Sequence, residues 1–154
     1  VPIARSNGYK ISYQVSGDGP AVVLHPGMFQ DGAHWAHSGY TSALTSTCTV
    51  IAIDPLGLGA SDAPHQAGDY SLERRVDSVT AVLDEVGVER AAFWGYSLGA
   101  MTGYAIAAPM RAFAERSSAN FLSVSNADHK GCWDRSTDVL PAVLSFLAAN
   151  AGMP

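Results

Sequence analysis

The spacing of hydrophobic and polar residues predicts several strands along the chain. Residues 9–16 alternate between apolar and polar, as expected of a half-buried strand. Residues 21–25, 49–54 and 91–96 are short apolar runs, which predicts strands that are buried on both faces. Residues 120–125 predict a last strand.

Between the apolar runs at 49–54 and 91–96, the hydrophobic spacing becomes helical from about Ser71 to Val86. The apolar positions are Leu72, Val76, Val79, Leu83 and Val86. Ser71 is a suitable N-cap, and Gly87 is a suitable residue to end the helix.

Two further helices are expected. One follows Ser97 and ends near Pro109 or, with a kink, near Arg116. The other covers residues 138–150 and places Pro141 in its first turn, where proline is tolerated.

Strands that alternate with helices predict an α/β fold with a mostly parallel sheet flanked by helices, in one domain over residues 1–154. Ligands of such sheets bind at the carboxyl ends of the strands. The segments after His25 and Asp54 and the turn at Ser97 therefore share one rim. The segment after Ser125 joins them if its strand is parallel to the others.

Composition narrows the classes of partner. The chain has 154 residues, of which 47% are hydrophobic and 15% charged, with a net charge of -5. This acidic balance argues against a nucleic-acid partner, and no apolar run approaches the ~18 residues of a membrane span.

Cys48 and Cys132 are expected to be free, mostly buried thiols. They favour a cytoplasmic location, and the first residues lack the long apolar segment of a signal peptide. Secretion is left open, because the sequence shows no initiator Met and processing is therefore allowed.

Candidate chemistry centres on Gly95-Tyr96-Ser97-Leu98-Gly99, which fits G-x-S-x-G between a strand and a helix. Such a sharp turn holds a serine hydroxyl above the sheet, and the two glycines let the strand and helix approach closely. The backbone N–H of Leu98 is a candidate oxyanion donor.

A candidate general base lies near the C-terminal end of the chain. His129 sits in an expected loop after the last predicted strand, so it can face Ser97 and exchange a proton with it. The other histidines fit structural or solvated roles better. His25 is expected to be hydrogen-bonded and structural, His34 and His37 to be surface or capping residues, and His65 to be solvated.

No cofactor or metal is implied. His34 and His37 lack a third ligand at a supporting spacing. Gly57-Leu58-Gly59 does not continue into the dinucleotide-binding pattern, because position 62 is Asp62.

Four segments, "LHPGMFQDGAHW", "IDPLGLGASD", "FWGYSLGA" and "NADHKGCWDRSTDVLPAVLSFL", together resemble the α/β-hydrolase superfamily in its esterase, lipase and peroxidase-like branches. The resemblance implies that Ser97 is the nucleophile and His129 the base. It implies that the N–H of Met28, or of Phe29 as second choice, is the other oxyanion donor. Asp54, Gly57 and Gly59 would shape the rim without reacting.

The resemblance leaves the catalytic acid open. Family members carry a cap and an acid-bearing strand between the nucleophile helix and the histidine, whereas about twenty residues separate Ala108 from His129 here. We therefore expect a minimal, cap-less core. Asp128 is the nearest carboxylate, Asp134 and Asp54 are alternatives, and a carboxylate of a second subunit or a Ser–His dyad without an acid are further ones.

The sequence predicts a carboxylesterase that cleaves small, short-chain acyl esters. Its apolar site would include Met28, Phe29, Tyr96, Met101 and Trp133. A non-catalytic ligand-binding or degenerate hydrolase-fold protein is one alternative, and a cofactor-free haloperoxidase-like or C–C bond hydrolase is another. An exposed sheet edge would also allow a homodimer.

Overall fold

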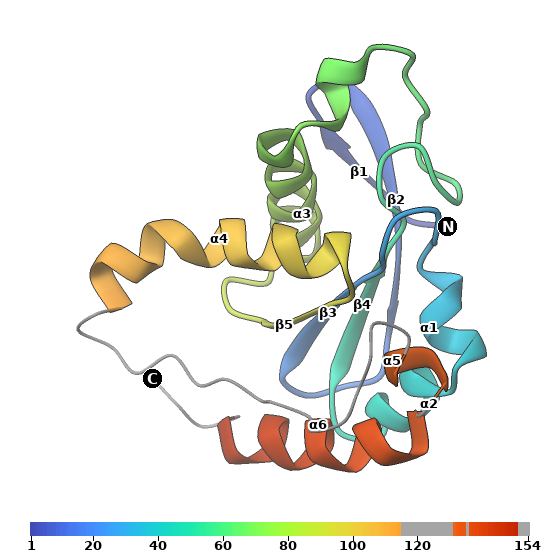
Figure 1. Cartoon of the computed structure of the whole chain (residues 1–154), viewed down its shortest axis with the longest axis vertical. Helices are drawn as coiled ribbons and strands as arrows, with labels where there is room; N and C mark the ends of the chain where they lie inside the picture. The colour runs from blue at the N-terminus through green and yellow to red at the C-terminus, as the bar shows by residue number, and fades with distance from the viewer. Residues whose placement is uncertain (115–130, 135, 151–154) are drawn as a thin grey trace.

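The computed structural model describes residues 1–114, 131–134 and 136–150, and a mixed sheet lies at its centre (Figure 1). Five strands within the described residues form this sheet, in the order β1-β2-β4-β3-β5. They are β1 (Ile3–Ser6), β2 (Tyr9–Ser16), β3 (Ala21–His25), β4 (Thr49–Ile53) and β5 (Ala92–Gly95).

The three strands that carry the candidate rim are parallel, which confirms the predicted fold class. β3 pairs in parallel with β4 on one side and with β5 on the other. β2 pairs antiparallel with β4, and β1 pairs antiparallel with β2. The sheet is therefore mixed, with a parallel part extended at one edge by a hairpin. The register sets His25 beside Gly95, which brings the ends of β3 and β5 together.

Helices cover both faces of the sheet (Figure 1). They are α1 (Ala33–His37), α2 (Tyr40–Leu44), α3 (Leu72–Val86), α4 (Leu98–Ala114), α5 (Gly131–Asp134) and α6 (Ser136–Asn150), with a 3₁₀ turn, η1 (Ala67–Tyr70), before α3. The caps of α3 are as predicted: the Ser71 side chain accepts a hydrogen bond from the Arg74 N–H, and Gly87 is left-handed, at φ 73°.

One helix boundary differs from its prediction. α6 begins at Ser136 and not at Asp138, so Pro141 lies inside the helix and not in its first turn. Ser136 and Thr137 are polar, so the apolar spacing from which the helix was predicted begins only after them. The interior proline has no N–H to donate to the carbonyl of Thr137. The strand predicted at 120–125 lies outside the described residues.

Alternate residues of the central strands build two cores. Val23, Ile51 and Ile53 point to one face, where they pack with Val79 and Val82 of α3. The opposite core contains Val22, Leu24, Trp35, Tyr40, Leu44, Cys48, Val50 and Ala52, against which Trp133, Leu140, Leu144 and Leu147 pack. Burial on both faces explains why β3 and β4 read as continuous apolar runs. The buried Cys48 is a free thiol, as expected.

Candidate active site

Ser97 occupies the turn between β5 and α4 in a strained backbone conformation. Its φ is 50°, in the left-handed region that residues with a Cβ seldom adopt. The turn is closed by a hydrogen bond of 2.8 Å from the Gly99 N–H to the Tyr96 carbonyl. The Met101 N–H then donates to the Ser97 carbonyl at 3.2 Å, which starts the helical ladder. Ser97 thus stands directly before the N-terminus of α4.

The flanking glycines are required by close packing. A Cβ on Gly95 would overlap the backbone carbonyl of Gly99, and a Cβ on Gly99 would overlap the carbonyl oxygen of His25. The Tyr96 N–H donates to this same His25 oxygen at 3.0 Å. The contact between Gly95 and Gly99 is the close approach of strand and helix that the G-x-S-x-G spacing predicted, and the contact with His25 sets the turn directly on the end of β3.

The loop after β3 lies against the turn. A Cβ on Gly27 would stand 2.7 Å from Cδ1 of Tyr96, so the Gly27 backbone contacts this ring. Gln30, which the sequence analysis did not single out, fastens the loop. Its side-chain oxygen accepts from the Gly27 N–H at 3.2 Å, and its own N–H donates to the Gly27 carbonyl at 3.3 Å.

Met28 and Phe29 lie at the tip of this loop and face solvent, with 57% and 84% of their surface exposed. Phe29 has φ 62°. Within the described residues, the non-glycine residues with positive φ are Asn7, Phe29 and Ser97, and two of these three belong to the candidate site. Strained residues concentrate at functional sites. The donor role of the Met28 N–H stays a prediction.

His25 is structural, as predicted. It is 2% exposed, and its Nδ1 lies 2.9 Å from the Pro26 carbonyl oxygen, to which Nδ1–H donates. Burial lowers the pKa of the imidazole to about 4, against the opposing effect of this hydrogen bond, and the nearby charge of Arg75 lowers it further. The neutral ring therefore belongs to the folded state at ordinary pH.

This buried imidazole predicts a loss of stability in mild acid. Between an unfolded pKa near 6.5 and a folded pKa of about 4, the unfolded chain binds a proton that the folded protein does not. The free energy of unfolding is expected to fall by about 3 kcal/mol as the pH drops across this window, and to level off below it. Urea unfolding at pH 7 and 4.5 measures most of this difference. His65→Gln, at an exposed residue, is the control and should keep the fall in the free energy of unfolding between the two pH values, whereas His25→Gln should lose it. An equal fall in both variants would contradict the assignment of this effect to His25.

Asp54 anchors three segments around the rim. Its Oδ1 accepts from the Gly32 N–H at 2.9 Å, and its Oδ2 accepts from the Ala60 N–H at 3.0 Å and the Ser12 hydroxyl at 2.9 Å. A Cβ on Gly59 would overlap the same carboxylate. These contacts favour the rim-shaping role over that of a catalytic acid.

The remaining histidines of the described residues differ in exposure and partners. Nδ1 of His34 lies 3.0 Å from Oδ1 of Asp31, whereas His37 and His65 are exposed. Burial acts to raise the pKa of Asp31, but hydrogen bonds from His34 and the Ala33 N–H lower it below its usual value. No group of three metal-ligating side chains occurs in the part of the chain that the structure describes.

Aromatic rings connect the turn to the C-terminal helices. The Tyr96 and Trp133 rings meet edge to face with centroids 4.9 Å apart, and Trp133 lies 4.7 Å from Trp35. The structure thus brings Tyr96, Ser97 and Leu98 together with the loop of Met28 and Phe29, and sets Trp133 beside them. His129 and Asp128 lie outside the described residues.

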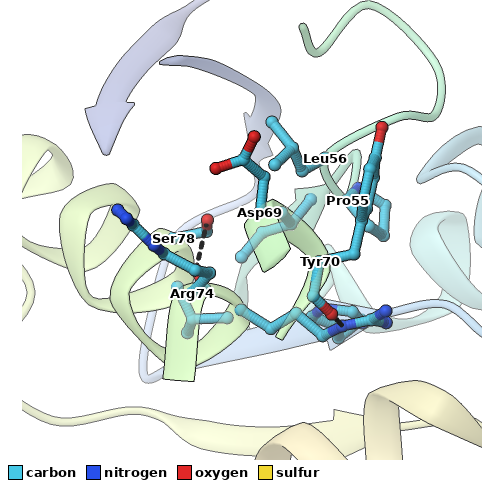
Figure 2. Close-up of a pocket in the computed structure, with 10 residues that line it drawn as sticks. Pro55, Leu56, Asp69, Tyr70, Arg74 and Ser78 are labelled. Atoms are coloured by element: carbon cyan, nitrogen blue, oxygen red, sulfur yellow. Dashed lines mark hydrogen bonds between the residues drawn. The ribbon is translucent and has the colours of Figure 1, made fainter. Parts of the chain in front are cut away.

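A cavity of about 10 Å³ lies elsewhere, between the end of β4 and α3 (Figure 2). It is large enough for about one water molecule. Two hydrogen bonds lie on its wall. The Ser78 hydroxyl donates to the Arg74 carbonyl at 2.8 Å (Figure 2), and Arg75 Nε donates to the Tyr70 carbonyl at 3.0 Å. Its size excludes it as a site for an organic substrate.

Among the described residues, no helix is long and apolar enough to cross a membrane.

The chain is similar in sequence to known proteins. Residues 20–129 match the family model described as the alpha/beta hydrolase fold. The cis-3-alkyl-4-alkyloxetan-2-one decarboxylase of Shewanella oneidensis is 34% identical over 113 residues, which cover 68% of this chain and 34% of the relative.

Two solved structures have a similar fold. The enol-lactonase from Burkholderia xenovorans LB400 superposes with a TM-score of 0.63 at 32% identity, over 70% of this chain and 41% of that one. An epoxide hydrolase of Vigna radiata superposes with a TM-score of 0.66 at 25% identity, over 71% of this chain and 34% of that one. The chain thus spans well under half the length of these similar proteins.

Proposed function

Because the chain belongs to the α/β hydrolase fold family, we propose that it is a serine hydrolase, and specifically a carboxylesterase for short-chain acyl esters. The observation that carries this proposal is the strained conformation of Ser97 at the start of α4. This conformation costs stability, so the fold alone gives no reason for it. It does place a hydroxyl directly before a helix N-terminus, which is the arrangement that nucleophilic attack requires.

The proposed reaction proceeds through an acyl-enzyme. Ser97 Oγ attacks the ester carbonyl while His129 takes its proton, and the carbonyl oxygen becomes an oxyanion. As the intermediate collapses, the C–O bond to the alcohol breaks and His129 gives the proton to the leaving oxygen. Water then attacks the acyl-enzyme with His129 again as base, which releases the carboxylic acid and restores the Ser97 hydroxyl.

The backbone provides the charge stabilisation in this proposal. Leu98 is the first residue of α4, so its N–H has no acceptor within the helix and lies at the positive end of the helix dipole. The Met28 N–H, on the loop that packs against Tyr96, would be the second donor. Asp128 is retained as the candidate acid that orients His129.

The surface beside the turn suits an apolar acyl group. Met28 and Met101 are each 57% exposed, and Phe29 is 84% exposed. Burying part of such surface against an acyl chain is favourable, at about 25 cal/mol per Å². An ester-like substrate class is also in keeping with the name of the similar enol-lactonase, because a lactone is a cyclic ester.

Covalent labelling tests the proposal directly. A fluorophosphonate is expected to react with the protein, and mass spectrometry of a digest is expected to place the adduct on the peptide that carries Ser97. His129→Gln is expected to slow labelling, since the hydroxyl loses its base. The exposed-serine variant Ser46→Ala is the matched control and should label like the wild type. Absence of an adduct, or an adduct on another serine, would refute a serine hydrolase mechanism at this turn.

A further inference from the structure

The three tryptophans of the chain all belong to one aromatic cluster on the face of the sheet that α1, α2, α5 and α6 cover. Trp35 is its centre, 5.1 Å from Trp94 and 4.7 Å from Trp133 between ring centroids. Tyr40 lies 4.7 Å from Trp94. Trp133 is the member that reaches from this core to the serine turn, through its contact with Tyr96.

Tyr96 is held from two sides. The Gly27 backbone of the loop after β3 contacts its ring on one side, and the Trp133 indole meets it edge to face, at an interplanar angle of 71°. The backbone of Tyr96 is fixed to β3 by its N–H bond to the His25 carbonyl. The Tyr96 ring is therefore a spacer between the loop that carries Met28 and the turn at Ser97.

Trp133 is itself held by packing. The helix that carries it, α5, has four residues, too few to be stable without tertiary contacts. Its Nε1 is buried and has no hydrogen-bond partner within the described residues. Burying such a donor costs free energy, so the ring contacts with Trp35 and Tyr96 must outweigh this cost for the indole to remain in place.

We propose that Trp133 is a positioning residue. Its indole packs against the Tyr96 ring, and this contact fixes the distance between the loop after β3 and the serine turn. The same contact therefore fixes the distance between the two oxyanion donors. This inference rests on the proposed function. The two candidate donors belong to separate segments, the Met28 N–H to the loop and the Leu98 N–H to α4. An oxyanion gains full stabilisation only when both lie at hydrogen-bond distance.

Trp133→Leu is expected to lower kcat for a short-chain ester by about 10- to 100-fold with KM changed less than threefold, because a shift of about 1 Å weakens a transition-state contact more than substrate binding. Trp133→Phe keeps a ring against Tyr96 and is expected to restore kcat to within about threefold of wild type. Leu44→Ala removes packing from the same core, on α2, and controls for loss of stability alone. It should leave kcat nearly unchanged.

A readout that is independent of activity accompanies the kinetics. Amide hydrogen exchange in the peptide that contains Gly27 and Gln30 is expected to accelerate in Trp133→Leu, and to stay at the wild-type rate in Trp133→Phe and Leu44→Ala. Equal exchange and equal kcat in Trp133→Leu and wild type would overturn the positioning role, as would the same losses in Leu44→Ala. Failure of the proposed function appears separately, as wild-type protein that is not labelled at Ser97, and the exchange rates still decide the role of Trp133.

Discussion

Ser97→Ala is expected to reduce kcat for a short-chain nitrophenyl ester by about 10⁴-fold or more, because in the proposed mechanism the Ser97 hydroxyl forms the acyl-enzyme. The remaining rate, above that in water, would come from binding and from the oxyanion donors, which the substitution leaves in place. Initial rates on the purified variant, with the wild type and Ser46→Ala in parallel, measure the effect.

A companion variant separates chemistry from strain at the same position. Ser97→Gly removes the hydroxyl and also the Cβ that makes φ 50° unfavourable. It is expected to be as inactive as Ser97→Ala but more stable than that variant, by about 0.5–1 kcal/mol, since the entropy cost of glycine offsets part of the relief. Urea unfolding of the pair tests this order. Activity retained in either variant would show that Ser97 is not the nucleophile.

The parallel core of the fold could be predicted because its signals are local. The runs that became β3, β4 and β5 are apolar at successive positions, and the structure buries alternate residues on opposite faces. The serine turn could be predicted for the same reason, since its glycines lie within two residues of Ser97 and their packing role follows from the pattern alone.

β1 was missed although the sequence carries a signal for it. Asn7 and Gly8 have φ of 50° and 87°, the left-handed pair that joins the strands of a tight hairpin. Asn-Gly is the dipeptide most typical of such a turn. The strand before it has four residues, Ile3–Ser6, too few for the alternation of apolar and polar residues to be visible.

Other features of the site depend on contacts between distant segments, which single-sequence patterns do not encode. The contact of Trp133 with Tyr96 joins α5 to the residue that follows β5, whereas the sequence predicts that both side chains belong to the apolar site and predicts no contact between them. The positive φ of Phe29 runs against the preference of an aromatic residue. The loop that contains it is closed by Gln30 and packed against the Tyr96 ring, and both constraints come from the folded structure.

Gly99→Ala is expected to cause the largest loss of stability, because its new methyl group would meet backbone and not a movable side chain. The Cβ would overlap the His25 carbonyl oxygen and approach the His25 carbonyl carbon to 2.8 Å. This oxygen also accepts the Tyr96 N–H, so relief of the overlap must move β3 away from the turn and weaken that bond. The free energy of unfolding is expected to fall by about 3 kcal/mol or more, at the upper end of the cost of overpacking.

Two other glycines separate the causes of this loss. Gly68→Ala would add a methyl with no atom within 4 Å, at a residue without positive φ, and is expected to change stability by less than about 0.5 kcal/mol. Gly39→Ala also meets no atom within 4 Å but has φ 80°, so it reports the cost of backbone strain alone. Gly99 is not among the positive-φ residues, so strain of the kind that Gly39→Ala reports does not contribute to its loss, and a loss in Gly99→Ala beyond that in Gly68→Ala measures the contact of the turn with β3. Unfolding midpoints of Gly99→Ala and Gly68→Ala that coincide would mean that the turn does not rest on β3, and the geometry proposed for nucleophilic attack would fail with it.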